Sequence, residues 1–271
     1  MEKIERRVKY LMIKKNRKPV ILISNDDGID ADGIRALTKE IKKFAEVYVI
    51  APNTQMSAVG HSITMSSPIR YTRHLIEKDF YGYAVDGTPA DAVKLGVRTI
   101  LKDKKIDLCL SGINQGSNTA INIIYSGTVS AATEGTILGI PSIAISLTSY
   151  VYKDFSVPAK FAARLAKTVL QNGLPQGTLL NVNVPAVPRN KIKGISVTRK
   201  GKSYWNDWYE SRLDPNKREY FWLTGKMLKL DKTIDFDQKA VDENYISVTP
   251  IHYDLTDYKM FEEMKNWKID F

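Results

Sequence analysis

Cysteine and histidine are scarce in this sequence, which has one cysteine, Cys109, and three histidines in 271 residues. A single cysteine excludes a disulfide within the chain and is typical of a reducing compartment. So few sulfur and imidazole ligands also exclude a His- or Cys-rich zinc site. The longest apolar run, Ile137 to Leu147, is too short to span a bilayer, and the N-terminus lacks the apolar core of a secretory signal. We therefore expect a cytoplasmic protein with no membrane partner.

Glycine-rich phosphate loops are also absent. No two of the 16 glycines are separated by a single residue, which excludes the dinucleotide fingerprint GxGxxG. The two GxxxxG spacings, starting at Gly28 and Gly82, are not followed by lysine, which excludes a Walker A loop. No serine has glycines two residues before and after it, which excludes a nucleophile elbow. Ordinary NAD enzymes, P-loop NTPases and α/β-hydrolases are therefore poor hypotheses.

The positive charge is concentrated at one end of the chain. The formal net charge is +10, and residues 1–20 contribute +6 of it through eight basic and two acidic side chains. We treat residues 1–18 as a basic N-terminal arm that could contact nucleic acid. Because the remaining chain is nearly neutral, nucleic-acid binding is not expected to be its main function.

The hydrophobic pattern predicts an α/β fold. A buried strand at 20–24, a helix at 31–44 and a strand at 47–51 form a βαβ unit, which favours a parallel sheet. The pattern recurs, with strands predicted at 106–111, 142–146, 179–184 and 245–249, and helices at 89–101, 128–138, 156–172 and 255–266.

The character of the chain changes at about residue 194. Residues 199–232 hold three of the four tryptophans among many charges, which suits a β-rich appendage, an interface or an aromatic mini-core under a long loop. We therefore divide the chain into the arm (1–18), an α/β catalytic core (19–193) and a C-terminal extension (194–271).

A pair of carboxylates follows the first predicted strand, in the segment Asn25-Asp26-Asp27-Gly28. Adjacent carboxylates repel each other unless a cation or hydrogen-bond donors compensate them, and their oxygens are typical ligands of Mg²⁺, Mn²⁺ and Ca²⁺. A turn at Gly28 would let both reach one site. Capping of the next helix by Asn and Asp is the alternative.

Three further polar groups follow later strands or begin a helix. They are Ser57, the segment 111–118 with Asn114 and Asn118, and the helix start Ser126-Gly127-Thr128. Taken alone, they suit a polar loop, a tight turn and an N-cap. Because ligands bind at the carboxyl ends of parallel strands, all four groups can meet at one edge of the sheet. Oxygen ligands beside neutral phosphate donors indicate metal-dependent phosphoryl chemistry.

The chain resembles the SurE (survival protein E) family of metal-dependent 5′-nucleotidases. The resemblance rests on ordered segments between residue 21 and about residue 256: ILISNDDGIDADGI, APNTQMSAVGHSIT, VDGTPADAV, LSGINQGSN, YSGTVSAATEG, NVNVP, DPNKREYFWLTG and ENYISVTPIHYDLT. It implies a Rossmann-like three-layer α/β/α core with a mostly parallel sheet. It also implies a C-terminal β-rich and helical extension that forms a homodimer or homotetramer.

The resemblance implies hydrolysis of nucleoside 5′-monophosphates, and in some members of 3′-monophosphates or short polyphosphate. One divalent ion per subunit, Mg²⁺ or Mn²⁺ (or Ca²⁺ in crystals), would be held by Asp26, Asp27, Ser57 and Asn114. Asp26 and Asp27 are the catalytic candidates, whether one acts as general base or forms a phospho-aspartyl intermediate. The phosphate-binding candidates are Asn25, Asn118, Ser126, Gly127 and Thr128.

Two alternatives to the nucleotidase remain open. One is an exopolyphosphatase or a phosphatase for another small phosphorylated metabolite. The other is a nucleic-acid-associated binding protein that uses the basic arm, for which binding should weaken steeply with salt.

Overall fold

The computed structural model describes residues 17–269, so most of the predicted basic arm, residues 1–16, lies outside the described residues. Nine strands in the described part form one sheet. In spatial order they are β3 (Tyr71–Ile76), β4 (Asp79–Val85), β2 (Glu46–Pro52), β1 (Val20–Ser24), β5 (Leu108–Gln115), β6 (Ser142–Leu147), β7 (Thr178–Val184), β11 (Tyr245–His252) and β8 (Gly194–Val197). Only the pairs β3–β4 and β7–β11 are antiparallel, so the sheet is mostly parallel, as predicted.

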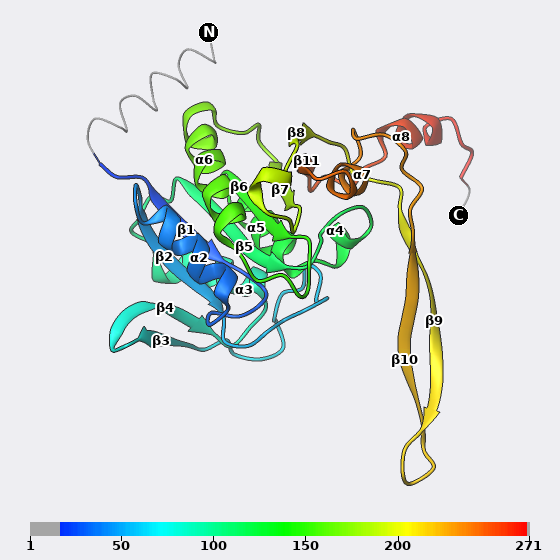
Figure 1. Ribbon diagram of the computed structural model, residues 1–271, viewed down its shortest axis with the longest axis horizontal. Coiled ribbons are helices and arrows are strands. Elements are labelled where there is room, and N and C mark those ends of the chain that lie inside the picture. The colour runs from blue at the N-terminus through cyan, green and yellow to red at the C-terminus, as the bar shows by residue number, and fades with distance from the viewer. Residues whose placement is uncertain (1–16, 270–271) are drawn as a thin grey trace.

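Helices cover both faces of this sheet (Figure 1). Helices α2 (Asp32–Ile41) and α6 (Ser156–Asn172) pack on one face, and α3 (Pro89–Leu95) and α5 (Gly127–Ile137) pack on the other. Strand β1 explains the arrangement, because Ile21 and Ile23 join the core under α2 and α6 whereas Leu22 joins the core under α3 and α5. A strand that is apolar on both faces needs a layer on each side. The predicted α/β class and the three-layer core are therefore confirmed.

Several elements differ from the predicted ones. The helix predicted over 89–101 is α-helical only to Leu95 and continues as a π-helical turn at Gly96–Ile100. The hairpin β3–β4 was not predicted, because its outer strand β3 is largely exposed and carries no apolar alternation. Short elements also escaped prediction: α4 (Asn122–Tyr125), a 3₁₀ turn at Arg189–Lys191, β8 and α7 (Asp237–Asp242).

The aromatic segment forms a two-stranded antiparallel ribbon that projects away from the sheet (Figure 1). Its strands are β9 (Tyr204–Leu213) and β10 (Glu219–Leu228), and a terminal helix α8 (Tyr258–Met264) lies near the C-terminal end. The segment is therefore β-structured and exposed rather than an aromatic mini-core. Strands β8 and β11, in contrast, extend the central sheet. Within residues 17–269, no helix has the length and hydrophobicity needed to cross a bilayer.

Candidate active site

The predicted ligand residues meet at the carboxyl end of the parallel sheet. Asp26 and Asp27 follow β1, Ser57 lies in the loop after β2, and Asn114 is near the end of β5. These four residues line one cleft of about 1020 Å³, together with Asn118 and Ser126. The structure therefore brings together six of the predicted site residues. Asn25, Gly127 and Thr128 do not line the cleft, and each instead shapes the surroundings of Asp26.

Asp26 is the more deeply buried of the two carboxylates and is 6% exposed. The Thr128 hydroxyl donates a hydrogen bond of 2.5 Å to Asp26 Oδ1. Burial raises the pKa of Asp26 to about 6; the Thr128 hydrogen bond opposes this shift and the neighbouring Asp27 charge adds to it. An ionised Asp26 is therefore costly in the protein alone, and a cation at the site would offset that cost.

Asp27 lies beside Asp26 and is only half-buried. Its Oδ2 accepts a hydrogen bond of 3.0 Å from the Gln115 backbone N–H, at the end of β5. Burial raises the pKa of Asp27, and the Gln115 hydrogen bond partly opposes that shift. The turn that separates the two carboxylates is closed by Asn25, whose amide donates to the Gly28 carbonyl at 2.8 Å. Gly28 has φ +94°, a conformation that favours glycine.

The start of helix α5 abuts Asp26. Ser126 caps the helix, since its hydroxyl accepts from the Val129 backbone N–H at 3.0 Å. A Cβ atom on Gly127 would lie 2.7 Å from Asp26 Cβ and 3.1 Å from Pro89 Cγ, so only glycine lets the helix start this close. The positive end of the helix dipole therefore faces the carboxylate that is hardest to ionise.

Asn118 is held by a buried polar network that the sequence reasoning missed. The Asn183 side chain accepts from the Asn118 backbone N–H at 2.8 Å and donates to its carbonyl at 3.1 Å, and Asn181 donates to the same carbonyl at 2.8 Å. The Asn118 amide donates to Ser146 Oγ at 2.9 Å and to Thr128 Oγ1 at 3.4 Å. The sequence signal for this network was a pair of asparagines, Asn181 and Asn183, at alternate positions of a buried strand. A strand covered on both faces exposes neither side chain to solvent, so both amides must find partners inside the protein.

Replacing Asn183 by alanine is expected to lower both stability and turnover. The change leaves the buried Asn118 N–H without its partner and removes one donor from the carbonyl, which should cost about 2–3 kcal/mol. Urea unfolding and kcat measure the two effects. Asn190→Ala, at an exposed asparagine seven residues along, is the control and should alter neither. A fully stable and active Asn183→Ala variant would show that the network does not fix Asn118.

Backbone hydrogen bonds attach the loop that carries Ser57 to the Asp26 turn and to the end of α4. The Met56 N–H donates to the Asp26 carbonyl at 2.7 Å, and the Gly60 N–H donates to the Tyr125 carbonyl at 3.1 Å. His61 Nε2 lies 3.0 Å from Glu134 Oε2 on α5, away from the residues that line the cleft. His61 therefore anchors the loop to α5. Ser57 itself is exposed, and its hydroxyl accepts a hydrogen bond from the Gln55 side-chain amide at 2.9 Å.

The donor set fits a hard divalent cation. Two carboxylates, a hydroxyl and an amide are the oxygen donors that Mg²⁺ and Mn²⁺ accept, and Mg²⁺ commonly uses only one or two protein carboxylates. Asn114 donates its amide N–H to the Gly116 carbonyl at 2.8 Å, so its oxygen is available as a ligand. Residues 17–269 hold no cluster of three His, Cys, Asp or Glu for a metal, so any ion here must use neutral oxygens as well.

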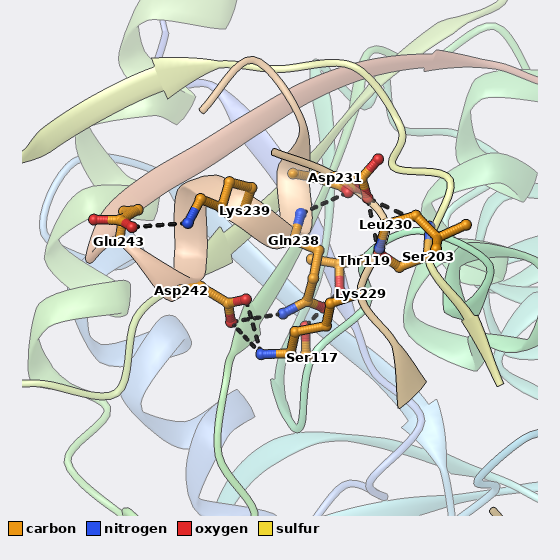
Figure 2. A network of polar contacts seen from close by, with 11 residues as sticks. Ser117, Thr119, Ser203, Lys229, Leu230, Asp231, Gln238, Lys239, Asp242 and Glu243 are labelled. Carbon is orange, nitrogen blue, oxygen red and sulfur yellow. Dashed lines mark hydrogen bonds and ion pairs between the residues drawn. The ribbon is translucent and has the colours of Figure 1, made fainter. Parts of the chain in front are cut away.

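The outer part of the cleft is formed by the root of the ribbon; from the sequence, the aromatic segment 199–232 could equally cover the pocket or join subunits. Tyr204, Trp205 and Asp207 from β9 line it, with residues 223–225 from β10. A polar network fixes this root against the loop that carries Asn118 (Figure 2). In that network Thr119 Oγ1 donates to Gln238 Oε1 at 2.6 Å, and the Asp231 carboxylate accepts from the Lys202 and Ser203 N–H groups and the Ser203 hydroxyl.

Comparison with known proteins places the chain in a family. The family model described as survival protein SurE matches residues 21–207. A 5′-nucleotidase SurE of Christiangramia forsetii is 44% identical over 94% of this chain and 98% of its own length. A 5′-nucleotidase SurE of Natranaerobius thermophilus is 46% identical over 92% and 99%, respectively.

A solved structure agrees with these relatives. The crystal structure of the SurE protein from Aquifex aeolicus superimposes with a TM-score of 0.80, at 44% identity, over 91% of this chain and 98% of that chain. The family match covers the cleft residues up to Asp207, and the relatives and the solved structure cover more than nine-tenths of the chain. This chain belongs to the SurE family.

Proposed function

We propose that this chain is a divalent-metal-dependent 5′-nucleotidase that hydrolyses nucleoside 5′-monophosphates to nucleoside and phosphate. The observation that carries the proposal is the charge of the cleft. Asp26, Asp27 and Asp207 line it, and no lysine or arginine is among its lining residues in the described part. A phosphate dianion would be repelled by such a site unless a cation compensates the carboxylates. The names of the relatives support the nucleotide as substrate.

Asp26, Asp27, Ser57 and Asn114 are the residues proposed to hold the cation. When bound, a divalent ion stabilises charge on the phosphoryl oxygens and lowers the pKa of water. The carboxylate of Asp27, which is half-buried and lines the cleft, is proposed to accept a proton from an attacking water. Asn118 and Ser126 line the same cleft and are proposed to contact the phosphate oxygens. For Asn118, this contact would replace the long 3.4 Å hydrogen bond that its amide donates to Thr128. A direct phosphate contact by Asn25, Gly127 or Thr128 stays a prediction.

The test is phosphate release from a panel of substrates. Nucleoside 5′- and 3′-monophosphates, short polyphosphate and a sugar phosphate would be incubated with the full-length protein in EDTA, Mg²⁺ or Mn²⁺. We expect release from 5′-monophosphates that EDTA abolishes and metal restores. Faster release from polyphosphate or the sugar phosphate would favour the alternative phosphatases. No release from any substrate with either metal would contradict the proposal.

We also propose that the ribbon β9–β10 joins subunits into a homodimer or homotetramer, with residues 19–193 as the catalytic core and 194–271 as the extension. An isolated two-stranded ribbon is marginally stable in water, and a large exposed apolar surface marks an interaction site. Beyond Tyr204 and Trp205 at its root, the ribbon exposes five further aromatic side chains: Trp208, Tyr209, Tyr220, Phe221 and Trp222. A cytoplasmic location stays a prediction and is supported by the buried, free thiol of Cys109.

Replacing Phe221 and Trp222 together by serine is expected to dissociate the oligomer. Both side chains are more than half exposed in one chain, so their loss should leave the fold of the core intact. Size-exclusion chromatography with light scattering would measure the mass. Leu75→Ser, on the exposed strand β3, is the matched control. An oligomer that survives the double substitution would assign the contact to another surface.

A further inference from the structure

The cleft extends well beyond the carboxylates. Its volume of about 1020 Å³ is at the upper end of ordinary small-molecule sites, and a phosphate group with its cation would occupy a fraction of it. Four aromatic side chains line the cleft: Tyr125, Tyr150, Tyr204 and Trp205. No lysine or arginine is among the described residues that line the cleft. The outer part of the cleft, with its aromatic side chains, therefore suits an uncharged, flat group rather than a second phosphate.

Trp205 is the aromatic residue whose orientation is best fixed. Its indole N–H donates to Asn122 Oδ1 at 2.7 Å, which attaches the ring to the loop that carries Asn118. The ring is still 42% exposed, so part of its surface is open. Tyr150, in comparison, is 79% exposed.

The backbone on both sides of this contact is also fixed. The buried Asp237 carboxylate accepts from the Ala120 N–H and the Gly201 N–H, each at 2.9 Å. It therefore bridges the Asn118 loop and the chain just before β9. The bonds of Thr119 to Gln238 and of Ser203 to Asp231 reinforce the same junction (Figure 2). Trp205 is thus held at a set position relative to Asn118.

The ribbon face that carries Trp205 adds a polar group to the cleft. Side chains alternate along a strand, so Trp205 and Asp207 share one face of β9, and both line the cleft. Gly225 pairs with Asp207 across the ribbon, and a Cβ atom there would lie 2.9 Å from the Asp207 Cα. Glycine at 225 therefore lets the two strands approach closely beneath Asp207. The Asp207 carboxylate, which lines the cleft, can accept hydrogen bonds from ribose hydroxyls or a base amino group.

We propose that Trp205 is the stacking platform for the nucleobase and is therefore the residue that makes this site select nucleoside monophosphates over sugar phosphates. The inference rests on the proposed function, since it assigns the part of the substrate beyond the phosphate. Aromatic side chains stack on any base, and purines offer the larger face. The selection is therefore broad among bases and strongest for purines.

Equilibrium binding tests the platform independently of turnover. The probes are a purine nucleoside phosphonate, in which a methylene group replaces the bridging oxygen, and the matching ribose phosphonate, each with Mg²⁺ and the full-length protein. We expect Trp205→Ala to lower the affinity ratio of nucleoside to ribose probe by about 5- to 150-fold, the range for loss of one base–aromatic stack. Trp205→Phe should keep most of the ratio, because it retains an aromatic face.

Trp267→Ala is the matched control, since Trp267 is an exposed tryptophan that lies outside the ribbon and does not line the cleft. It should leave the ratio unchanged. If Trp205→Ala does not fold, Asn122→Ala is the second variant, and freeing the indole should lower the ratio by a smaller factor. An unchanged ratio in Trp205→Ala, or in Asn122→Ala where that variant replaces it, overturns the proposal. Tight, Trp205-dependent binding in a protein that hydrolyses no nucleotide would support the platform and refute the proposed function.

Discussion

Replacing Asp26 by asparagine is expected to abolish phosphatase activity and yet stabilise the metal-free protein. The substitution removes the most buried ligand of the proposed cation, and the loss of several kcal/mol of charge stabilisation predicts at least about a thousandfold lower kcat. The fold should survive, because asparagine has nearly the same shape and can still accept the Thr128 hydrogen bond. Metal-dependent phosphate release and thermal unfolding in EDTA would measure the two effects.

The stability effect follows from the pKa of Asp26. Burial raises that pKa from 3.8 to about 6 in the folded protein. A raised pKa contributes stability that is fully present below pH 3.8 and is lost as the pH rises through 6, on the order of 3 kcal/mol in total. At pH 7 without metal, Asp26→Asn should therefore unfold several degrees above wild type, and the difference should vanish near pH 3.5.

Asp30→Asn provides the control, because Asp30 is an exposed carboxylate four residues further along the chain. It should keep full activity and should not raise the unfolding temperature at pH 7 without metal. An active Asp26→Asn enzyme would remove Asp26 from the catalytic site. A metal-free Asp26→Asn protein that is less stable than wild type at pH 7 would show that burial of the charge is not the dominant effect.

Replacing Gly33 by alanine is expected to destabilise the protein strongly and to reduce activity, although Gly33 contacts no proposed ligand. Gly33 lies in the first turn of α2, and a Cβ atom there would lie 1.9 Å from the Ile113 carbonyl oxygen. Helix α2 or strand β5 would have to move, and β5 carries Asn114. Alanine favours a helix over glycine by about 1 kcal/mol. We expect the clash to exceed this and to cost more than about 3 kcal/mol net.

Chemical denaturation and kcat would measure this effect. Lys39→Ala, on the exposed side of the same helix, should change stability by less than about 0.5 kcal/mol. If Gly33→Ala were more stable than wild type, helix propensity would outweigh packing here, and the contact between α2 and β5 would be looser than the structure indicates.

The core of this fold was predictable because its strands are short apolar runs. Strand β1 is buried along its whole length, and the following Asn-Asp-Asp-Gly segment leaves the sheet where polar groups reach the cleft. The edge hairpin β3–β4 was not predictable in this way, since β3 is largely exposed and β4 is buried only toward its C-terminal end. The π-helical turn after Leu95 keeps the apolar spacing of a helix and so resembles one in sequence.

Candidate site residues were predictable only where the residue types and their spacing in the sequence indicate the chemistry, without knowledge of long-range contacts. Paired aspartates point to a cation site or to a helix cap whatever the fold. Asn183 and Asp237, in contrast, act by holding the Asn118 loop across large separations in the chain, which residue spacing does not reveal. The contribution of Trp205 to the cleft depends on the contact between the root of the ribbon and that loop. No local sequence pattern predicts this contact.

The ribbon carries both a residue of the cleft and the surface proposed for subunit contact. Its strand β9 contains ten residues and spans about 34 Å, with Trp205 at the cleft and the exposed aromatics further along. In the assembly proposed above, a subunit contact on the outer ribbon would also hold its root in the position that the cleft requires. Substrate affinity and self-association would then be linked free energies, and each would raise the other by the same factor. Diluting the protein would therefore weaken nucleotide binding, and adding nucleotide would protect the assembly from dilution.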